Sequence, residues 1–261
     1  MAVKALPGHG NTLTHKQSHI PAMSDSPFTI RFGLFMALLV SFLMPLILFS
    51  PLIIAKILNL SLIDKIDILA DNFGVFILFS QAIGLFVSVF LIAKQLKKRN
   101  LSWASVGLKG FRTFQAVRYI AGYYLFLLSL LIVLAMVAMS LGIQDPPISS
   151  DEPGGSGMLR VMGGFWPTFA LTVAVAPIVE ELIFRGVLFP ALQRRYGAFV
   201  GVTVSSLLFT LVHIDPLQMI SVLPLGVYLA IMYQRTGSIY PGMILHATWN
   251  LMVLLIAQAA A

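Results

Sequence analysis

Two adjacent glutamates lie inside one of the most apolar stretches of the chain. Glu180 and Glu181 occur in VAVAPIVEELIFRGVLF, whereas the other eight of the ten acidic residues fall in polar segments or connections. An ionisable side chain at membrane depth is costly and is retained mainly where it has a function. A carboxylate in such surroundings can act as a general base that takes a proton from water. The two glutamates are therefore the first candidates for chemistry.

The spacing around these glutamates separates their expected roles. Arg185 follows Glu181 by four residues, so the two side chains share a helix face and can form an ion pair. Glu180 projects about 100° away around the same helix and is not offered this partner. We expect Glu180 to be the reactive carboxylate and Glu181 with Arg185 to support it. A purely structural ion pair is the alternative for Glu181 and Arg185, because buried pairs are weak evidence of catalysis.

Two of the five histidines also lie in apolar stretches. His213 ends SSLLFTLVHI and His246 lies in GMILHATWNLMVLL. Phe209 precedes His213 by four residues and Asn250 follows His246 by four, so each pair is predicted to share a helix face. Taken singly, each histidine can be a packing residue and Asn250 can be a bridge between helices.

A turn at Gly197 would bring the first two of these segments together. Glu180 lies 17 residues before Gly197 and His213 lies 16 after it, so antiparallel helices joined there would place both side chains at one depth. His246 lies about nine residues beyond the turn at Gly237 and fits this scheme less well. Matching its depth to that of His213 would require a shortened or broken helix before Gly237.

Most of the chain consists of apolar stretches long enough to cross a bilayer. Of its 261 residues 58% are apolar and 10% are charged, whereas a soluble domain carries about 25% charged residues. A membrane span needs about 20 apolar residues. The hydrophobic stretches predict spans at residues 33–58, 71–93, 119–143, 161–192, 197–213, 217–234 and 240–259. The expected fold class is all-α, a polytopic transmembrane bundle of about seven spans (six to eight).

The remaining segments predict how the chain is organised. Residues 1–28 are expected to form a flexible polar tail, and residues 29–99 to form N-terminal transmembrane helices. Residues 100–261 are expected to form the membrane core that carries the candidate residues. Within it, residues 101–117 are predicted to lie along the membrane interface, and residues 144–157 to form a flexible external connection. The absence of cysteine excludes a thiol nucleophile, disulfides and a thiolate metal site.

The charge distribution predicts an orientation in the membrane. The formal net charge is +7, and many basic residues fall in segments that would share one side: Lys4, Lys16, Arg31, Lys94, Lys97, Lys98, Arg99, Lys109, Arg112, Arg118, Arg194, Arg195 and Arg235. The opposite side would carry Asp64, Asp67, Asp71, Asp145, Asp151 and Glu152. Because Lys and Arg mark cytoplasmic connections, we expect an integral protein of a bacterial plasma membrane with a cytoplasmic N-terminus. Membrane lipid is an expected partner and nucleic acid is not.

Three segments, taken in order, resemble the CAAX protease and bacteriocin-processing family, also called the Abi family, whose members are similar to CAAX prenyl protease 2. They are EELIFR (180–185), FTLVH (209–213) and HATWN (246–250). The family pattern is two glutamates followed by x-x-x-Arg, then Phe-x-x-x-His, then His-x-x-x-Asn. Each segment alone is a weak signal, whereas the three in this order are specific. The resemblance covers roughly residues 100–255.

The resemblance implies an intramembrane endopeptidase that processes prenylated CAAX-type or other membrane-associated peptides. Its residue assignments are water activation by Glu180 and His213, oxyanion stabilisation by His246 and Asn250, and support from Glu181, Arg185 and Phe209. The substrate would be a peptide or a membrane protein.

Alternatives remain for the cofactor and for the function. A mechanism without a cofactor is expected, and zinc held by Glu180, His213 and His246 is the alternative, although the chain has no HExxH signature. The alternative function is a non-catalytic membrane protein of bacteriocin-immunity or regulatory type, with which the family is also associated. A transporter is disfavoured because no internal repeat is found.

Overall fold

The computed structural model describes residues 28–43, 73–142, 164–213 and 216–259. Within these ranges the regular structure is helical throughout, and no strand occurs in them. The prediction of an all-α bundle is therefore confirmed. The predicted polar tail, up to residue 27, and the predicted connection at 144–157 lie outside the described residues.

Residues 44–58, 71–72, 143 and 161–163 of the predicted spans lie outside the described residues. Within the described residues, helical stretches overlap all seven predicted spans. They are α1 (Ile30–Leu38) with the π-helical η1 (Leu39–Leu43), α4 (Phe73–Lys98), the 3-10 turn η3 (Trp103–Val106), α5 (Thr113–Ser140), the continuous run α7 (Phe165–Thr168), η4 (Phe169–Val175), α8 (Ala176–Glu181), η5 (Leu182–Leu188) and α9 (Phe189–Tyr196), then α10 (Ala198–Leu211), α11 (Pro216–Thr236) and α12 (Tyr240–Ala259). By length and composition, three helices in the described part could each cross a membrane: Phe79–Lys98, α5 and α12.

The ends of two helices differ from the hydropathy prediction. α5 begins at Thr113, six residues before the predicted start, so only residues 101–112 of the predicted interfacial stretch lie outside a long helix. α4 continues to Lys98, five residues beyond its predicted end. Polar residues at helix ends lower the local hydropathy without ending the helix, and lysines near a C-terminus favour the helix dipole.

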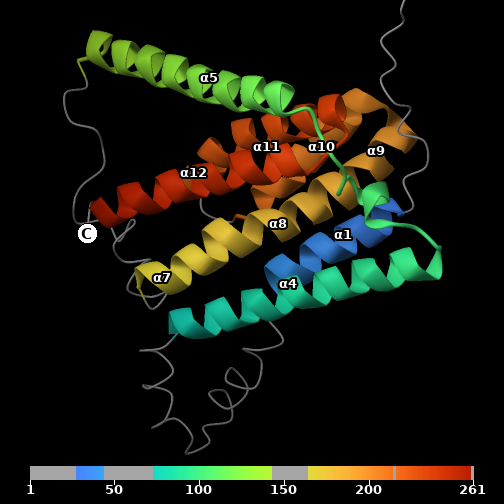
Figure 1. Cartoon of the computed structure of the whole chain (residues 1–261). Coiled ribbons are helices and arrows are strands. Elements are labelled where there is room, and N and C mark those ends of the chain that lie inside the picture. Colours follow the sequence, from blue (N-terminus) through green and yellow to red (C-terminus); the bar gives the residue numbers. More distant parts are fainter. Residues whose placement is uncertain (1–27, 44–72, 143–163, 214–215, 260–261) are drawn as a thin grey trace, which may run out of the picture.

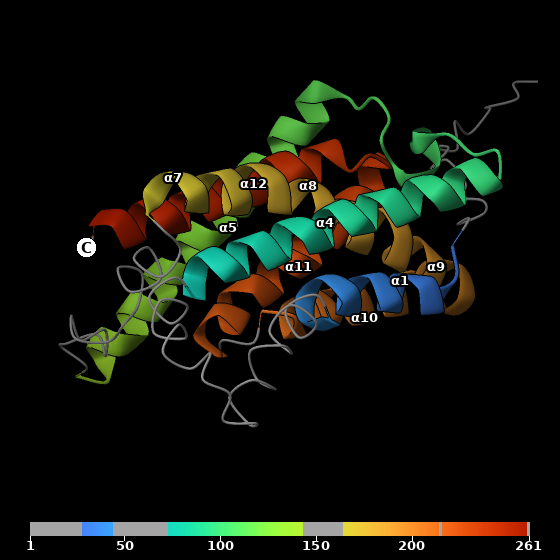
Figure 2. The ribbon, with the colours of Figure 1, turned by 90° about the horizontal axis from the view of Figure 1, so that it is seen from below.

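The helices pack as a bundle from which one member diverges. Figure 1 shows α4, the run from α7 to α9 and α12 lying side by side, with α5 separating from α12 toward its C-terminal end. Figure 2, turned by 90°, shows α1, α10 and α11 on the other side of this layer. α12 contacts η4 and α8, while α10 contacts both α9 and α11. The middle of the run, α8 and η5, is thus enclosed by neighbouring helices.

Pro177 explains why the run widens at η4. Proline has no N–H, and its ring would collide with the carbonyl of the residue four positions earlier in an α-helix. The preceding residue, Ala176, donates its N–H to Leu171, five residues back, which is the π-helical pattern. The carbonyl of Thr172 then has no helical donor, because Ala176 is bonded to Leu171 and Pro177 has no hydrogen to donate.

Pro190 repeats this arrangement at the end of η5. Phe189 donates its N–H to Phe184, again five residues back, and Pro190 follows directly. Both π segments therefore end just before a proline. Helices bend at prolines and at π segments, so the run does not form one regular α-helix. The first widened segment precedes α8, which carries Glu180 and Glu181, and the second, η5, carries Arg185.

Two glycines set the path of α10. Gly197 has φ +87°, in the left-handed region that glycine occupies without strain, and it joins α9 to α10 at the predicted turn. Gly226 on α11 faces Phe209 of α10, and a Cβ at this position would lie 3.1 Å from the phenyl ring. Small residues permit this close approach of helices in membrane proteins.

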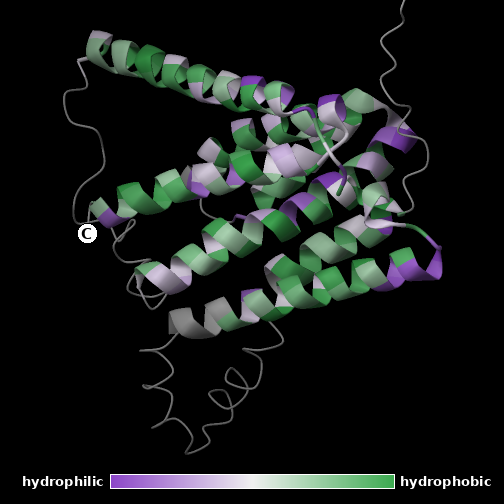
Figure 3. Cartoon of the chain, viewed as in Figure 1, coloured by the Kyte–Doolittle hydropathy of each residue, from purple (hydrophilic) through white to green (hydrophobic). Residues whose placement is uncertain are grey.

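The C-terminal part of α5 exposes apolar side chains in all directions. Leu131, Ile132, Val133 and Leu134 are 52% to 55% exposed, and four consecutive residues cover a full helical turn. Figure 3 shows that this stretch is mostly hydrophobic, whereas polar segments gather where α4 ends, where α5 begins and at α9. A bilayer supplies the apolar surroundings that this surface requires, since an α-helix satisfies its own backbone groups.

Candidate active site

A buried ion pair forms the base of the candidate site. Glu181 and Arg185 are both fully buried, and Arg185 Nη1 donates to Glu181 Oε1 at 3.0 Å. Arg185 Nη2 donates to the backbone carbonyl of Gly226 at 3.0 Å, and the guanidinium carbon lies 4.3 Å from the centre of the Phe209 ring. The predicted pair is therefore present. Through its contacts with Phe209 and Gly226, Arg185 also links η5 to α10 and α11.

His246 of α12 lies between the two glutamates. Its Nδ1 is 3.4 Å from Glu181 Oε1, and its Nε2 is 3.8 Å from Glu180 Oε2. Glu181 Oε1 is thus close to both Arg185 and His246. Because Nδ1 of His246 faces Glu181, Nε2 is the ring nitrogen that faces Glu180. With a neutral imidazole, the two glutamates, Arg185 and His246 sum to a formal charge of −1. These side chains form what we call the carboxylate–imidazole cluster: Glu180, Glu181, Arg185 and His246.

Only one member of this cluster is substantially exposed. The Glu180 side chain is 23% exposed, compared with 1% for Glu181 and 2% for His246. A hydrolytic site needs a carboxylate that water and substrate can reach. Glu180 therefore has the access that the reaction requires, while Glu181 has the environment of a supporting residue.

Several buried polar atoms of the cluster have no hydrogen-bond partner among the described residues. They are Glu180 Oε2, Glu181 Oε2, Arg185 Nε and His246 Nδ1. Leaving one such atom unpaired costs about 1–3 kcal/mol, and most proteins pair nearly all of them. A concentration of unpaired groups at one place indicates a site arranged to meet a polar ligand rather than to maximise stability.

Gly242 allows α12 to come this close to α8. A Cβ at position 242 would lie 2.8 Å from Glu181 Oε2, closer than real Cβ atoms approach an oxygen.

α11 is a continuous helix over Pro216–Thr236 despite the internal Pro224. His246 therefore reaches the glutamates without the shortened or broken helix that matching the depth of His213 was expected to require.

His213 lies just beyond the end of α10 instead of on its face. The helix ends at Leu211, and the His213 N–H donates to the Thr210 carbonyl at 3.1 Å. The Phe209 carbonyl, which lacks its helical donor as a result, contacts His213 Nδ1 at 2.8 Å. Because a carbonyl only accepts, Nδ1 carries the hydrogen in this contact, and Nε2 of the neutral ring is a free acceptor.

Phe209 connects the two histidines. Its ring centre is 5.1 Å from that of His213 and 5.4 Å from that of His246, both in edge-on geometry. In the described part of the chain, His213 makes no ion-pair contact with Glu180. Glu180 is therefore in contact with His246, and His213 packs against the Phe209 ring.

Asn250 lies one turn beyond His246 on α12. Its Nδ2 donates to the Thr172 carbonyl at 2.7 Å, the same carbonyl that Pro177 leaves without a helical donor. Asn250 therefore bridges α12 and η4, as in the alternative interpretation of this residue. The amide has two hydrogens, so one remains for another acceptor.

The zinc alternative does not fit the arrangement of these side chains. Zinc in peptidases takes three protein ligands that converge on one point. Across the ranges that the structure describes, no three His, Asp or Glu side chains are grouped in this way. Among the described residues, Glu180 has an ion-pair contact with His246 and none with His213.

Three groups in this site were not singled out from the sequence. They are the carbonyls of Gly226 and Thr172 and the small surface of Gly242, each of which contacts a candidate side chain. Pro177 is the signal that could have indicated the unpaired Thr172 carbonyl, since a proline inside a helical stretch removes one donor. A glycine in an apolar helix could likewise have indicated a close approach.

Comparisons with known proteins match the segment that contains this site. Residues 162–252 match the family model described as "Type II CAAX prenyl endopeptidase Rce1-like". "Putative membrane peptidase YdiL" of Bacillus subtilis (strain 168) is 33% identical over 81 residues, covering 31% of this chain and 33% of that protein. "UPF0177 protein YbdI" of Lactococcus lactis subsp. lactis (strain IL1403) is 33% identical over 91 residues, covering 34% and 49%.

These matches confirm the resemblance to the CAAX protease family for residues 162–252. The chain spans about a third of the length of one curated relative and about half of the other. No solved structure matches the chain. Together with the apolar helices, the matches support an integral membrane protein.

Proposed function

We propose that this chain is an intramembrane endopeptidase in which Glu180 activates water for attack on a peptide bond. The observation that carries the proposal is the asymmetry of the carboxylate–imidazole cluster. Glu180 is 23% exposed and faces His246, whereas the adjacent Glu181 is buried against Arg185. The match of residues 162–252 to an endopeptidase family supports the same reaction class.

The proposed reaction begins with proton transfer from water to Glu180. His213 assists through Nε2, which accepts a hydrogen bond from the same water. The water oxygen forms a bond to the peptide carbonyl carbon, and the carbonyl oxygen becomes an oxyanion. Glu180 then gives its proton to the amide nitrogen as the carbon–nitrogen bond breaks, so the products are a carboxylic acid and an amine. The reaction consumes one water molecule and needs no other reactant.

His246 and Asn250 are the proposed donors to the oxyanion. Protonated His246 would donate through Nδ1 toward Glu181 and through Nε2 toward the reacting group. Asn250 would use the amide hydrogen that is not bonded to Thr172. A donor of this kind typically contributes about 10²–10³ to turnover. Their common position on α12 means that one helix would supply both donors.

The proposed substrates are prenylated CAAX-type peptides or other membrane-associated peptides. The family model and one of the two relatives carry peptidase names, and the described helices expose apolar surface suited to a bilayer. A lipid-anchored peptide would reach the buried cluster from the membrane, without first entering water.

The test compares purified wild-type protein with Glu180→Gln. Both are incubated in detergent with fluorescent peptides, prenylated and unprenylated, with and without a strong chelator. We expect wild-type cleavage that survives chelation and a loss of at least about 10²-fold in the variant. Cleavage lost on chelation and restored by zinc would replace this mechanism with a metal-dependent one. A folded wild type that cleaves none of the peptides would favour the non-catalytic alternative.

A further inference from the structure

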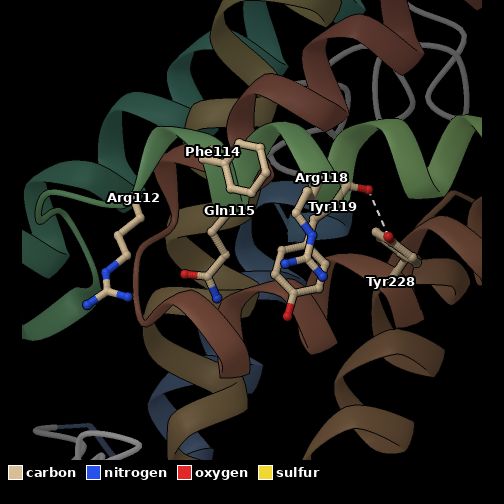
Figure 4. A pocket seen from close by; sticks show the side chains of 6 residues that line it. All are labelled: Arg112, Phe114, Gln115, Arg118, Tyr119 and Tyr228. Carbon is tan, nitrogen blue, oxygen red and sulfur yellow. Dashed lines mark hydrogen bonds between the residues drawn. The ribbon is translucent and has the colours of Figure 1, made fainter.

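A pocket of about 550 Å³ lies far along the chain from the glutamates, at the beginning of α5. The lining residues are Arg112, Phe114, Gln115, Arg118, Tyr119 and Tyr228. Figure 4 shows Arg112 on one side of the pocket and Tyr228 on the other, with Gln115 and Arg118 between them. This volume is within the range of small-molecule sites in proteins.

Two contacts hold the pocket between α5 and α11. The Tyr228 hydroxyl donates to the Tyr119 carbonyl at 2.7 Å, and Gln115 Nε2 donates to the Arg235 carbonyl at 3.5 Å. Gly122 permits the first contact, because a Cβ there would lie 2.9 Å from the Tyr228 hydroxyl. Packing between α5 and α11 therefore sets most of the pocket wall, and Arg112 joins it from the position directly before α5.

The pocket is positively charged without compensation by neighbouring acids. Arg112 and Arg118 both line it, and no lining residue is acidic. Among the described residues, neither arginine forms an ion pair with Asp or Glu. A guanidinium offers several donors in a planar arrangement that matches phosphate oxygens. The charge and shape thus suit a phosphate-bearing group.

The surroundings of the pocket separate a lipid from a soluble phosphate. Phe114 is 76% exposed and Val117 is 56% exposed, and further along α5 Leu125 is 64% exposed. Aromatic and basic residues next to an apolar helix are typical of the membrane interface. A phospholipid can place its headgroup between the arginines and its acyl chains along α5, whereas a free phosphate can contact only the arginines.

We propose that this pocket binds the headgroup of an anionic phospholipid, with Arg112 and Arg118 holding the phosphate and the acyl chains lying on α5. Basic pockets on the cytoplasmic side of membrane proteins recognise such headgroups. The site is separate from the carboxylate–imidazole cluster, and its assignment does not depend on the proposed peptidase activity.

The test is lipid binding to the full chain by native mass spectrometry. Detergent-purified protein is titrated with phosphatidylglycerol and with phosphatidylcholine of the same acyl chains, near physiological ionic strength so that distant charges are screened. Each basic side chain at an anionic surface contributes roughly a fivefold gain in affinity. We therefore expect tighter binding of phosphatidylglycerol by wild type, and about 25-fold weaker binding by the double variant Arg112→Gln/Arg118→Gln.

The matched control is Lys97→Gln/Lys98→Gln, which removes two exposed charges at the end of α4 that do not line the pocket. It should bind phosphatidylglycerol like wild type. Arg112→Lys/Arg118→Lys keeps the charge but loses the planar donors, so its affinity should lie between those of wild type and the glutamine variant, and this comparison remains available if the glutamine variant fails to fold. Equal losses in the pocket and control variants would overturn the proposal, as would equal binding of the two lipids by wild type. Binding of glycerol 3-phosphate as tight as that of the lipid would assign the pocket to a soluble phosphate instead.

Discussion

At the scale of single residues, neighbouring glutamates have different surroundings because they point in directions about 100° apart on one helix. Glu181 points toward Arg185 and α12, where its Oε1 accepts from Arg185 at 3.0 Å. The Glu180 side chain is partly exposed, and among the described residues its ion-pair contact is with His246. The same residue type thus fills a supporting position and a proposed reactive one.

Arg185→Gln should destabilise the protein strongly. The change leaves Glu181 buried without its cation and the Gly226 carbonyl without its guanidinium donor. Removing one member of a buried pair costs about 3–5 kcal/mol. Thermal unfolding in detergent should show a much lower midpoint, whereas Arg195→Gln, at an exposed position on α9, should leave the midpoint nearly unchanged. Equal midpoints for the two variants would show that the buried pair does not support the fold.

His213→Asn should lose cleavage and keep its stability. The asparagine amide nitrogen can reach the Phe209 carbonyl as Nδ1 does, but the side chain offers nothing at the position of Nε2. Loss of assistance to the water is expected to lower kcat by about 10²-fold or more. Peptide cleavage and the unfolding midpoint are measured on the same sample. Cleavage within a few-fold of wild type would remove His213 from the proposed mechanism.

Sequence spacing predicts contacts within a helix better than contacts between helices. The pairing of Glu181 with Arg185 follows from four residues of separation and is present. The contact of His246 with both glutamates depends on how α12 is positioned against α8, which no local spacing determines. Phe209 and His213 were expected on one helix face, but α10 ends before His213 and the imidazole caps that end. The proposed roles of these residues in catalysis remain predictions.

At the scale of elements, the two prolines in the run Phe165–Tyr196 shape the site. Each is preceded by a π-helical segment whose last N–H bonds five residues back. Hydropathy predicts one apolar span here, and one continuous helical run is observed over the described residues. The widened turns were not predicted, because hydropathy does not record which backbone N–H groups are missing. Pro177 carried that information, and its consequence is the Thr172 carbonyl that receives Asn250.

A double-mutant cycle tests this link between α12 and η4. Asn250→Leu leaves the Thr172 carbonyl without its side-chain donor and should cost about 1–3 kcal/mol. Pro177→Ala restores an N–H five residues after Thr172, within π-helical reach of the same carbonyl. Pro177→Ala should therefore recover stability in the Asn250→Leu background by more than it changes the wild type. Strictly additive effects on the unfolding free energy would contradict the link.

At the scale of the whole molecule, most basic residues of the described ranges gather at one end of the bundle. The last turns of α4, α9 and α11 each carry Lys or Arg, and α5 begins next to Arg112. Figure 3 shows polar segments at these places and mostly hydrophobic residues along α5. Because Lys and Arg are enriched in cytoplasmic connections, this clustering agrees with the predicted orientation, which stays a prediction.

The absence of cysteine makes the orientation directly measurable. Lys98→Cys, Arg195→Cys and Ser140→Cys each introduce a single thiol at an exposed position. A membrane-impermeant maleimide added to intact cells should label Ser140→Cys, at the far end of α5, and should label the other two only after the membrane is opened. Labelling of Lys98→Cys and Arg195→Cys from opposite sides would contradict the arrangement of the bundle, and complete reversal would contradict the predicted orientation.

The central claim is that Glu180 reacts while Glu181 supports, and one paired measurement tests it. Glu180→Gln and Glu181→Gln make the same chemical change at adjacent positions, and each purified variant is assayed for both peptide cleavage and thermal unfolding. Glu180→Gln should lose cleavage at an unfolding midpoint close to that of wild type. Glu181→Gln should instead lower the midpoint, because it leaves Arg185 buried without an anion. A Glu180→Gln variant that is as stable as wild type and cleaves at the wild-type rate would contradict the account.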